Sequence, residues 1–198
     1  NTVGFGPSGW WGETTDGPGF LDWLRHLGRD PAAERAVIFG AGGAARSIAQ
    51  ALAGAGAGEI VVAARAARLE SYRGTWAQIP QARLEPQAGP VVEEAIERRA
   101  TVLVNATPIA DAAGPHGLNR LRPSMLVLDL VYGAELSAWA RAARVRGLQA
   151  DDGLGLLDRS CKLRQPLSSR RHRGGQRCDR RSRILPFEIQ GGCVSSLG

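Results

Sequence analysis

Residues 36–45 read Ala-Val-Ile-Phe-Gly-Ala-Gly-Gly-Ala-Ala, and the predicted fold follows from this segment. Its first four residues form an uninterrupted apolar run with the length of a buried strand. A glycine-rich turn follows directly, and residues 46–55 then have the composition of a helix. A strand, a glycine turn and a helix in this order are typical of a nucleotide-binding unit, in which backbone N–H groups at the helix start approach a pyrophosphate.

The glycines of this turn fit the G-x-G-x-x-G/A pattern of dinucleotide-binding turns. Gly40 and Gly42 occupy its first two positions, and Ala45 stands at the third, where alanine is allowed. The alternative is a turn with a purely structural role. The predicted pyrophosphate-binding residues are Gly40, Ala41, Gly42, Gly43 and Ala44.

Strands and helices alternate on both sides of this turn. An amphipathic helix is predicted over 16–27, with Asp16 as its N-cap and Gly28 as its C-terminal stop. Strands are predicted over 59–63, 101–104 and 125–130, and helices over 66–76, 91–98 and 135–146. This alternation predicts an α/β fold with a doubly wound parallel sheet.

Arg65 stands just after the second predicted strand, where the cofactor ribose of such folds is bound. An acidic residue there accepts hydrogen bonds from the 2′-hydroxyl of NAD, whereas a basic residue pairs with the 2′-phosphate of NADP. Arg68 lies close by, and no carboxylate does. The sequence therefore favours NADP, with a solvated surface arginine as the alternative.

Three further positions are candidates with ordinary structural alternatives. Asp16 could serve only as a helix cap, the segment Asn105–Pro108 after a predicted strand could be a plain turn, and the same holds for Tyr132. His26, His116 and His172 are isolated, and the three cysteines have irregular spacing. We predict no metal site and no nucleophilic triad.

The net charge of +6 is concentrated in residues 158–198, which hold 10 of the 25 basic and 3 of the 19 acidic residues. Alanine disappears there, and all three cysteines and the one lysine, Lys162, are found there. We interpret 158–198 as a basic tail, either disordered or produced by a reading-frame shift. The rest has the balance of a soluble cytoplasmic protein without a membrane span.

Seven motifs in order resemble the shikimate dehydrogenase family. They are Asn1-Thr2, Thr14 to Phe20, Gly40 to Ala45, Ala64-Arg65-Ala66, Val104 to Pro108, Asp129 to Tyr132, and Asp152 to Leu157. The resemblance implies an NADP-dependent oxidoreductase that reversibly reduces 3-dehydroshikimate to shikimate in aromatic amino acid biosynthesis.

The resemblance also implies roles for individual residues. Asp16 matches an aspartate that binds the substrate hydroxyls and pairs with the catalytic lysine, and Asn1 and Tyr132 match other substrate contacts. Gly40 to Ala44 match the pyrophosphate turn and Arg65 the 2′-phosphate ligand. The positions near the nicotinamide half of the cofactor are Thr107, Leu130 and Gly153.

The match ends at Leu157 and includes several departures from the family pattern. The family's lysine belongs to an N-terminal substrate domain, so we expect 1–19 to be the end of that domain, 20–157 the NADP-binding domain and 158–198 the tail. Ser160 stands where the family has a glutamine, and Lys162 lies far beyond the cofactor fold, so it is not assigned the role of that lysine. We expect NADPH binding but no turnover by these 198 residues alone.

Several alternatives stay open at this point. One is a quinate/shikimate dehydrogenase that uses NAD, against which Arg65 counts. Others are a methylenetetrahydrofolate dehydrogenase or a glutamyl-tRNA reductase, against which Asp16-Gly17 together with Val104 to Pro108 counts. A third is a non-catalytic nucleotide-binding remnant whose tail contacts nucleic acid, a partner that we do not favour. A small-molecule substrate is expected, and a homodimer remains an open option.

Overall fold

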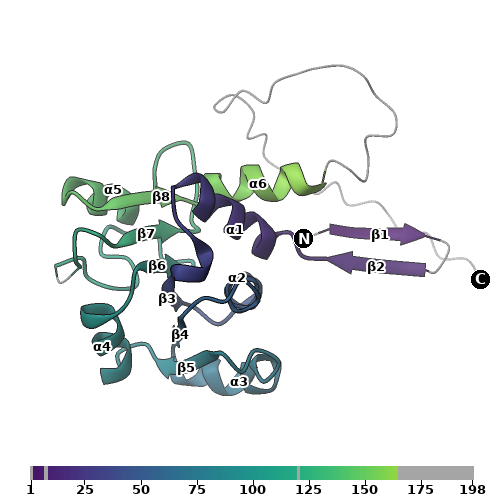
Figure 1. Cartoon of the computed structure of the whole chain (residues 1–198), viewed down its shortest axis with the longest axis horizontal. Coiled ribbons are helices and arrows are strands. Elements are labelled where there is room, and N and C mark those ends of the chain that lie inside the picture. Colours follow the sequence, from purple (N-terminus) through teal and green to yellow (C-terminus); the bar gives the residue numbers. More distant parts are fainter. Residues whose placement is uncertain (1, 7–8, 120, 165–198) are drawn as a thin grey trace, which may run out of the picture.

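The computed structural model describes residues 2–6, 9–119 and 121–164, and its centre is a six-stranded parallel sheet (Figure 1). The strands lie in the order β5-β4-β3-β6-β7-β8. Their bounds are Arg35–Phe39 for β3, Glu59–Ala64 for β4, Ala82–Pro86 for β5, Val102–Asn105 for β6, Leu126–Asp129 for β7 and Gln149–Asp152 for β8. This is the strand order of dinucleotide-binding doubly wound folds, so the predicted fold class is confirmed.

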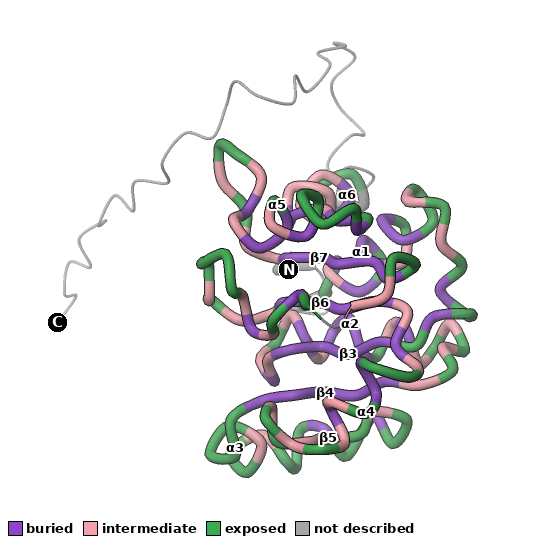
Figure 2. The backbone as a smooth tube through the Cα atoms, turned by 90° about the vertical axis from the view of Figure 1, so that its left-hand side faces the viewer, coloured by how far each residue is buried: buried purple, intermediate pink, exposed green. Residues whose placement is uncertain are grey.

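Helices cover both faces of this sheet. One core cluster holds side chains of α1 (Asp16–His26), α2 (Gly43–Gly54), α3 (Ala66–Trp76) and α6 (Leu154–Arg164). The cluster on the opposite face holds side chains of α4 (Pro90–Arg98) and α5 (Ala138–Val145). Figure 2 shows the strands β3, β4, β6 and β7 as buried backbone between these two layers. The sheet is therefore doubly wound, as its alternating pattern predicts.

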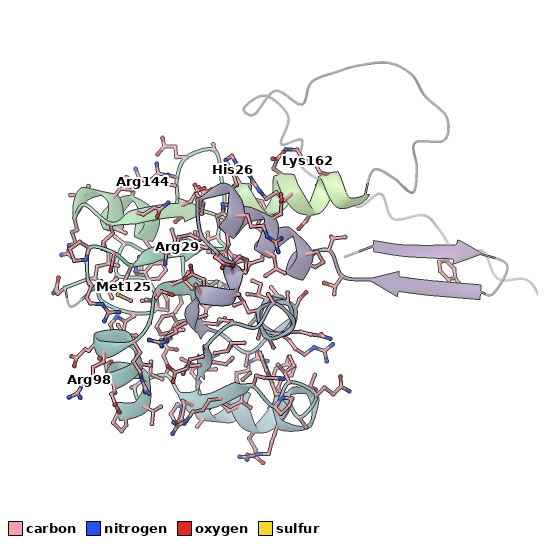
Figure 3. All side chains as sticks on the ribbon, viewed as in Figure 1. His26, Arg29, Arg98, Met125, Arg144 and Lys162 are labelled. Carbon is pink, nitrogen blue, oxygen red and sulfur yellow. The ribbon has the colours of Figure 1, made fainter. Side chains whose placement is uncertain are left out.

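The central strands are apolar because both of their faces are buried. Val37 and Phe39 point into one core cluster, whereas Ala36 and Ile38 point into the other. The labelled Met125 lies within the body of the molecule, whereas Arg98, Arg144 and Lys162 lie at its periphery (Figure 3). An apolar run of this kind leaves ligand chemistry to the loops at the strand ends.

A separate antiparallel hairpin precedes this body. It consists of β1 (Thr2–Gly6) and β2 (Gly9–Glu13), and it projects away from the parallel sheet in Figure 1. The chain then enters α1, and a short 3-10 helix, η1 (Pro31–Ala33), leads into β3. The body of the fold therefore begins near the start of α1.

Several predicted boundaries require correction. Thr15, not Asp16, is the N-cap of α1, and Asp16 is the first helical residue. The helix after the glycine turn starts at Gly43 and not at residue 46. β5 and β8 were not predicted, because both are edge strands with mixed polar composition that gives no buried apolar run.

The last described helix extends beyond the predicted end of the fold. α6 runs to Arg164 and thus crosses the boundary placed after Leu157. Arg159 and Ser160 are both buried. The prediction of no helical structure directly after Leu157 is therefore wrong for residues 158–164, whereas residues 165–198 lie outside the described part of the chain.

None of the helices in the described residues is long and apolar enough to cross a membrane.

Candidate functional site

The candidate site lies at the edge where the parallel strands end. β3 pairs with β4 on one side and with β6 on the other, so the connections leaving β3 and β6 diverge to opposite faces. Ligands of open α/β sheets bind at such a switch point, outside the carboxyl ends of the strands. A dinucleotide placed here has one half over β3, β4 and β5 and the other half over β6, β7 and β8.

Gly40 is required by the close approach of two chain segments. Its φ is +108°, a conformation that side chains disfavour. A Cβ atom on Gly40 would also lie 2.7 Å from the carbonyl oxygen of Ala106, in the loop after β6. The Gly40 amide donates to the Ala63 carbonyl at 2.8 Å, so this residue joins three strand ends.

Gly42 and Gly43 have a different environment. A Cβ at either position would meet no atom within 4 Å, so the packing of the protein itself does not require glycine there. Gly42 is the N-cap of α2, and among the described residues no side-chain hydrogen bond caps this helix and no acidic residue lies in its first turn. The space and the uncapped amides leave room for a phosphate group to approach the positive end of the helix.

The remaining residues of the turn fix it to its neighbours. The Trp76 indole donates to the Ala41 carbonyl at 3.3 Å and so ties the turn to the end of α3. Ala45 is fully buried in the core beneath the turn, which is the close helix–sheet packing expected at the third position of the pattern. The turn is therefore held in place before any ligand binds.

Arg65 lies at the end of β4, next to a cavity of about 440 Å³. The cavity lining consists of Ala64, Arg65, Ala66, Pro86, Gln87 and Ala88. Arg65 and the nearby Arg68 are exposed, and neither forms an ion pair with any residue that the structure describes. The backbone of Gln87 donates to the Ala64 carbonyl at 3.0 Å and so joins the end of β5 to the end of β4 beside the cavity. The free guanidinium group of Arg65 in the cavity lining suits a phosphate, and Arg68 follows three residues later in α3.

Thr107 is held by a fully buried side chain at the end of β6. The Asn105 Oδ1 accepts from the Thr107 amide at 2.9 Å and from the Thr107 hydroxyl at 2.6 Å. The Asn105 Nδ2 donates to the Ile109 carbonyl at 2.9 Å. Asn105 thus shapes the whole loop after β6, and its buried amide explains why asparagine follows this apolar strand.

Leu130, Tyr132 and Gly153 come together at the ends of β7 and β8. A Cβ on Gly153 would overlap the Leu130 carbonyl and would lie 3.0 Å from the Tyr132 ring. The Gly153 amide donates to the Val131 carbonyl at 3.2 Å. Tyr132 itself is 51% exposed, so its ring and hydroxyl are available to a ligand.

Two buried aspartates occupy paired positions on these strands, Asp129 on β7 and Asp152 on β8. Burial raises the pKa of Asp129 above its ordinary value, and interactions with the Ser137 side chain, the Val131 amide and the Asn105 side chain oppose this effect. Burial also raises the pKa of Asp152, with the Leu154 amide opposing and Asp151 adding to it. Both carboxyl groups therefore hold a proton more tightly than an exposed aspartate does.

Asp16 lies in the first turn of α1, where glycines allow close packing. The Gly17 amide donates to the Ser47 hydroxyl on α2 at 3.0 Å, and Gly19 packs against Ser160 on α6. The Ser160 hydroxyl in turn donates to the Thr15 carbonyl at 3.3 Å. The candidate Asp16 is therefore placed by α2 and α6, whereas the candidate Asn1 lies outside the described residues.

Lys162 does not join this group. It is exposed on α6, and its Nζ donates to Asp158 at 2.7 Å, one helical turn earlier. The Lys162 ammonium is therefore engaged within α6.

The predicted site residues at the strand ends lie along one edge of the sheet, and Asp16 lies in the first turn of α1. Thr107 lies against Gly40, and Leu130 lies with Tyr132 and Gly153, while Arg65 stands beyond β4. Sequence reasoning missed the supporting residues Ser47, Gln87, Asp129, Ser137 and Asp152. Asp129 and Asp152 carried a signal, because each is a carboxylate at the end of an apolar or buried strand segment.

A larger cavity of about 710 Å³ lies away from this edge, between residues 112–119 and α5. Its lining is mainly apolar, with Arg141 and Arg146 near it, and it touches none of the predicted site residues. Within the described part of the chain, no group of three or more histidine, cysteine or acidic residues could hold a metal ion.

Comparison with curated proteins identifies relatives of the chain. It is 35% identical over 167 residues to a shikimate dehydrogenase (NADP(+)) of Microcystis aeruginosa, covering 79% of this chain and 58% of that protein. It is 40% identical over 165 residues to the enzyme of the same name from Acidiphilium cryptum, covering 79% and 55%. The chain therefore spans somewhat more than half the length of these relatives. No protein-family model matches it.

Solved structures agree with the sequence relatives. A shikimate 5-dehydrogenase from Listeria monocytogenes in complex with shikimate and NAD matches with a TM-score of 0.70 and 26% identity, over 82% of this chain and 60% of that one. The Thermus thermophilus shikimate 5-dehydrogenase in complex with NADP(H) and shikimate matches with a TM-score of 0.65 and 32% identity, over 82% and 59%. The resemblance predicted from the seven motifs is thus confirmed for about four fifths of the chain.

Proposed function

We propose that this chain is the cofactor-binding part of an NADP-dependent shikimate dehydrogenase, which reversibly reduces 3-dehydroshikimate to shikimate. The observation that carries the proposal is the glycine turn, where Gly42 and Gly43 leave space that the protein's own packing does not use. The free guanidinium group of Arg65 at the end of β4 favours NADP over NAD, and Arg68 in the first turn of α3 adds a second positive charge nearby. The names of the curated relatives support the same cofactor.

Each residue group has a separate task in this proposal. The turn from Gly40 to Ala44 binds the pyrophosphate, and Arg65 pairs with the 2′-phosphate. Thr107, Leu130 and Gly153 line the nicotinamide half of the site. NADPH, when bound, supplies the hydride for carbonyl reduction. Asp16 and Tyr132 contact the substrate, with Asp16 pairing with the lysine that the family carries on its substrate domain.

The domain assignment belongs to the same proposal. Residues 1–19 include the hairpin and are assigned to the substrate domain, and the cofactor domain follows. We further propose a cytoplasmic protein with a small-molecule substrate and a homodimeric assembly, which light scattering of the purified chain tests directly.

The test is a titration of the full 198-residue chain with NADPH and with NADH, followed by tryptophan fluorescence. Trp76 is a suitable reporter because its indole is hydrogen-bonded to the glycine turn. We expect NADPH to bind more tightly than NADH. Arg65→Ala should weaken NADPH binding about tenfold, because one charge-assisted phosphate contact is lost, and should leave NADH binding unchanged.

Arg98→Ala is the matched control, since Arg98 lies in the last turn of α4, outside the cavity beside β4. Equal affinity for the two cofactors, or an Arg65→Ala variant that binds both as the parent does, would contradict the assignment of NADP. A preference for NADH would instead support the alternative of an NAD-using quinate/shikimate dehydrogenase. The Listeria enzyme was solved in complex with shikimate and NAD.

A further inference from the structure

The buried carboxylate of Asp129 has an unusual position in this fold. It stands at the last residue of β7, on the candidate ligand edge, and is fully buried. Charged groups are costly to bury unless their hydrogen bonds compensate, so such a residue needs a structural or functional reason. Its hydrogen bonds indicate that reason.

One oxygen of this carboxylate holds two separate segments of the site. Asp129 Oδ1 accepts from the Asn105 Nδ2 at 2.8 Å and from the Val131 amide at 3.1 Å. The first bond fixes Asn105, whose Oδ1 binds both the amide and the hydroxyl of Thr107. The second fixes Val131, whose carbonyl accepts from the Gly153 amide.

The other oxygen, Oδ2, is buried and has no partner in hydrogen-bond geometry among the described residues. The Ser137 side chain, at the N-cap of α5, lowers the pKa of Asp129, and the Ser137 amide donates to Asp152 Oδ2 at 3.3 Å. The two loop contacts of Asp129 are therefore both made by Oδ1.

We propose that Asp129 is a positioning residue, which holds the loop after β6 and the turn after β7 in the arrangement that binds the nicotinamide half of the cofactor. This inference rests on the proposed function. Asp129 does not touch the cofactor in this proposal, and it acts through Asn105 on Thr107 and through Val131 on Gly153. The adenosine half of the site, at β4 and β5, lies on the other side of β3 and does not depend on it.

Binding measurements with two ligands distinguish the nicotinamide half of the site from the adenosine half. NADPH occupies the whole site, whereas adenosine 2′,5′-bisphosphate contains only the groups that the adenosine half recognises. Calorimetric titration of the full chain with each ligand gives two dissociation constants per variant. Asp129→Ala should weaken NADPH binding about tenfold, the equivalent of one hydrogen bond to a charged group, and should change bisphosphate binding less than about twofold.

Asp129→Asn tests whether the acceptor atom is what matters. Its amide oxygen still accepts from Asn105 and Val131, so NADPH affinity should return to within about threefold of the parent. Glu34→Ala removes another buried carboxylate at the opposite edge of the sheet, and it should leave both affinities unchanged despite its cost in stability. If Asp129→Ala does not fold, Asn105→Ala breaks the same connection and should show the same selective loss.

The outcomes distinguish this inference from the function on which it rests. Equal weakening of both ligands by Asp129→Ala, no weakening of NADPH binding, or no recovery in Asp129→Asn would overturn the positioning role while the cofactor assignment stands. If the parent chain binds neither ligand, the proposed function itself fails and this inference fails with it.

Discussion

Gly40 and Gly42 belong to the same turn, but glycine is needed at the two positions for different reasons. Gly40 has a positive φ and lies against the Ala106 carbonyl, so it is required by the protein's own packing. Gly42 has ordinary dihedral angles and open space around it, so glycine is needed there only for the approach of the proposed pyrophosphate. Substitutions at the two positions should therefore affect different properties.

Gly40→Ala should lower the free energy of unfolding by about 1–3 kcal/mol, because the strained backbone and the close carbonyl both oppose a side chain. Gly42→Ser should leave stability unchanged or slightly higher, because serine is a good N-cap. The new hydroxyl would, however, accept from the amides that a pyrophosphate needs, and NADPH binding should weaken about tenfold. Urea denaturation and NADPH titration measure the two effects, and a Gly42→Ser chain with parental NADPH affinity would argue against the pyrophosphate assignment.

The buried aspartates predict a pH dependence with an unusual sign. The pKa of Asp129 is raised by burial, so the folded chain binds this proton more tightly than the unfolded chain does. Stability from this group is therefore greatest below the unfolded pKa, and it is lost as pH rises to the folded pKa. The pKa of Asp152 is also raised, so this group acts in the same direction. The charged residue beside Asp152 is Asp151, which is paired with Arg144.

Asp129→Asn removes this titration while keeping the shape of the side chain. The difference in unfolding free energy between variant and parent should shift in favour of the variant as pH rises through the window between the two pKa values. The slope within that window is at most about 1.4 kcal/mol per pH unit. Urea denaturation at several pH values measures it, and a difference independent of pH would show that Asp129 has the same pKa in both states.

At the opposite edge of the sheet, where the parallel strands begin, the side chains of Arg29 and Glu34 join several elements. Glu34 is buried before β3, and its Oε1 and Oε2 accept from the Nε and Nη2 of Arg29 at 2.7 and 3.0 Å. Arg29 also donates to the carbonyls of Ser124 and Thr101, and the Thr101 hydroxyl donates to Glu34. This network joins the end of α1 to the starts of β3, β6 and β7.

Glu34→Ala should lower the free energy of unfolding by about 3 kcal/mol, because it leaves the guanidinium of Arg29 partly buried without its carboxylate. Thermal unfolding followed by circular dichroism measures the loss. Asp30→Ala is a suitable control, since Asp30 caps only the exposed η1 turn. A Glu34→Ala chain as stable as this control would show that the network contributes little.

The extension of α6 beyond Leu157 makes a prediction about where the folded unit ends. The Arg159 Nη1 donates to the Gly155 carbonyl at 2.9 Å, its Nε lies 3.2 Å from Asp22, and Ser160 fills the space beside Gly19. A chain ending at residue 157 should therefore unfold about 3–8 °C below a chain ending at residue 164, because these contacts are worth about 1–2 kcal/mol. Differential scanning calorimetry compares the two, and equal midpoints would place the boundary at Leu157 after all.

In the molecule as a whole, the sequence predicts those elements whose structure depends on residues close together in the chain. Buried parallel strands such as β3 and β7 are apolar runs, and the glycine turn has its own pattern, so both were predictable. The edge strand β5 was not, because residues 82–86 include charged side chains and a proline. The hydrogen bonds of Asp129 were not predictable either, since they depend on how loops 24 residues apart meet in space.

The hairpin of β1 and β2 has a consequence for handling the protein. Within the described residues it forms a two-stranded sheet of its own, and such a sheet has marginal stability in isolation. Its outer backbone edges present N–H and C=O groups to which any other extended chain can add. The edges of this hairpin are therefore a route by which two copies of the chain associate in concentrated solution, and this route is separate from the cofactor edge of the parallel sheet.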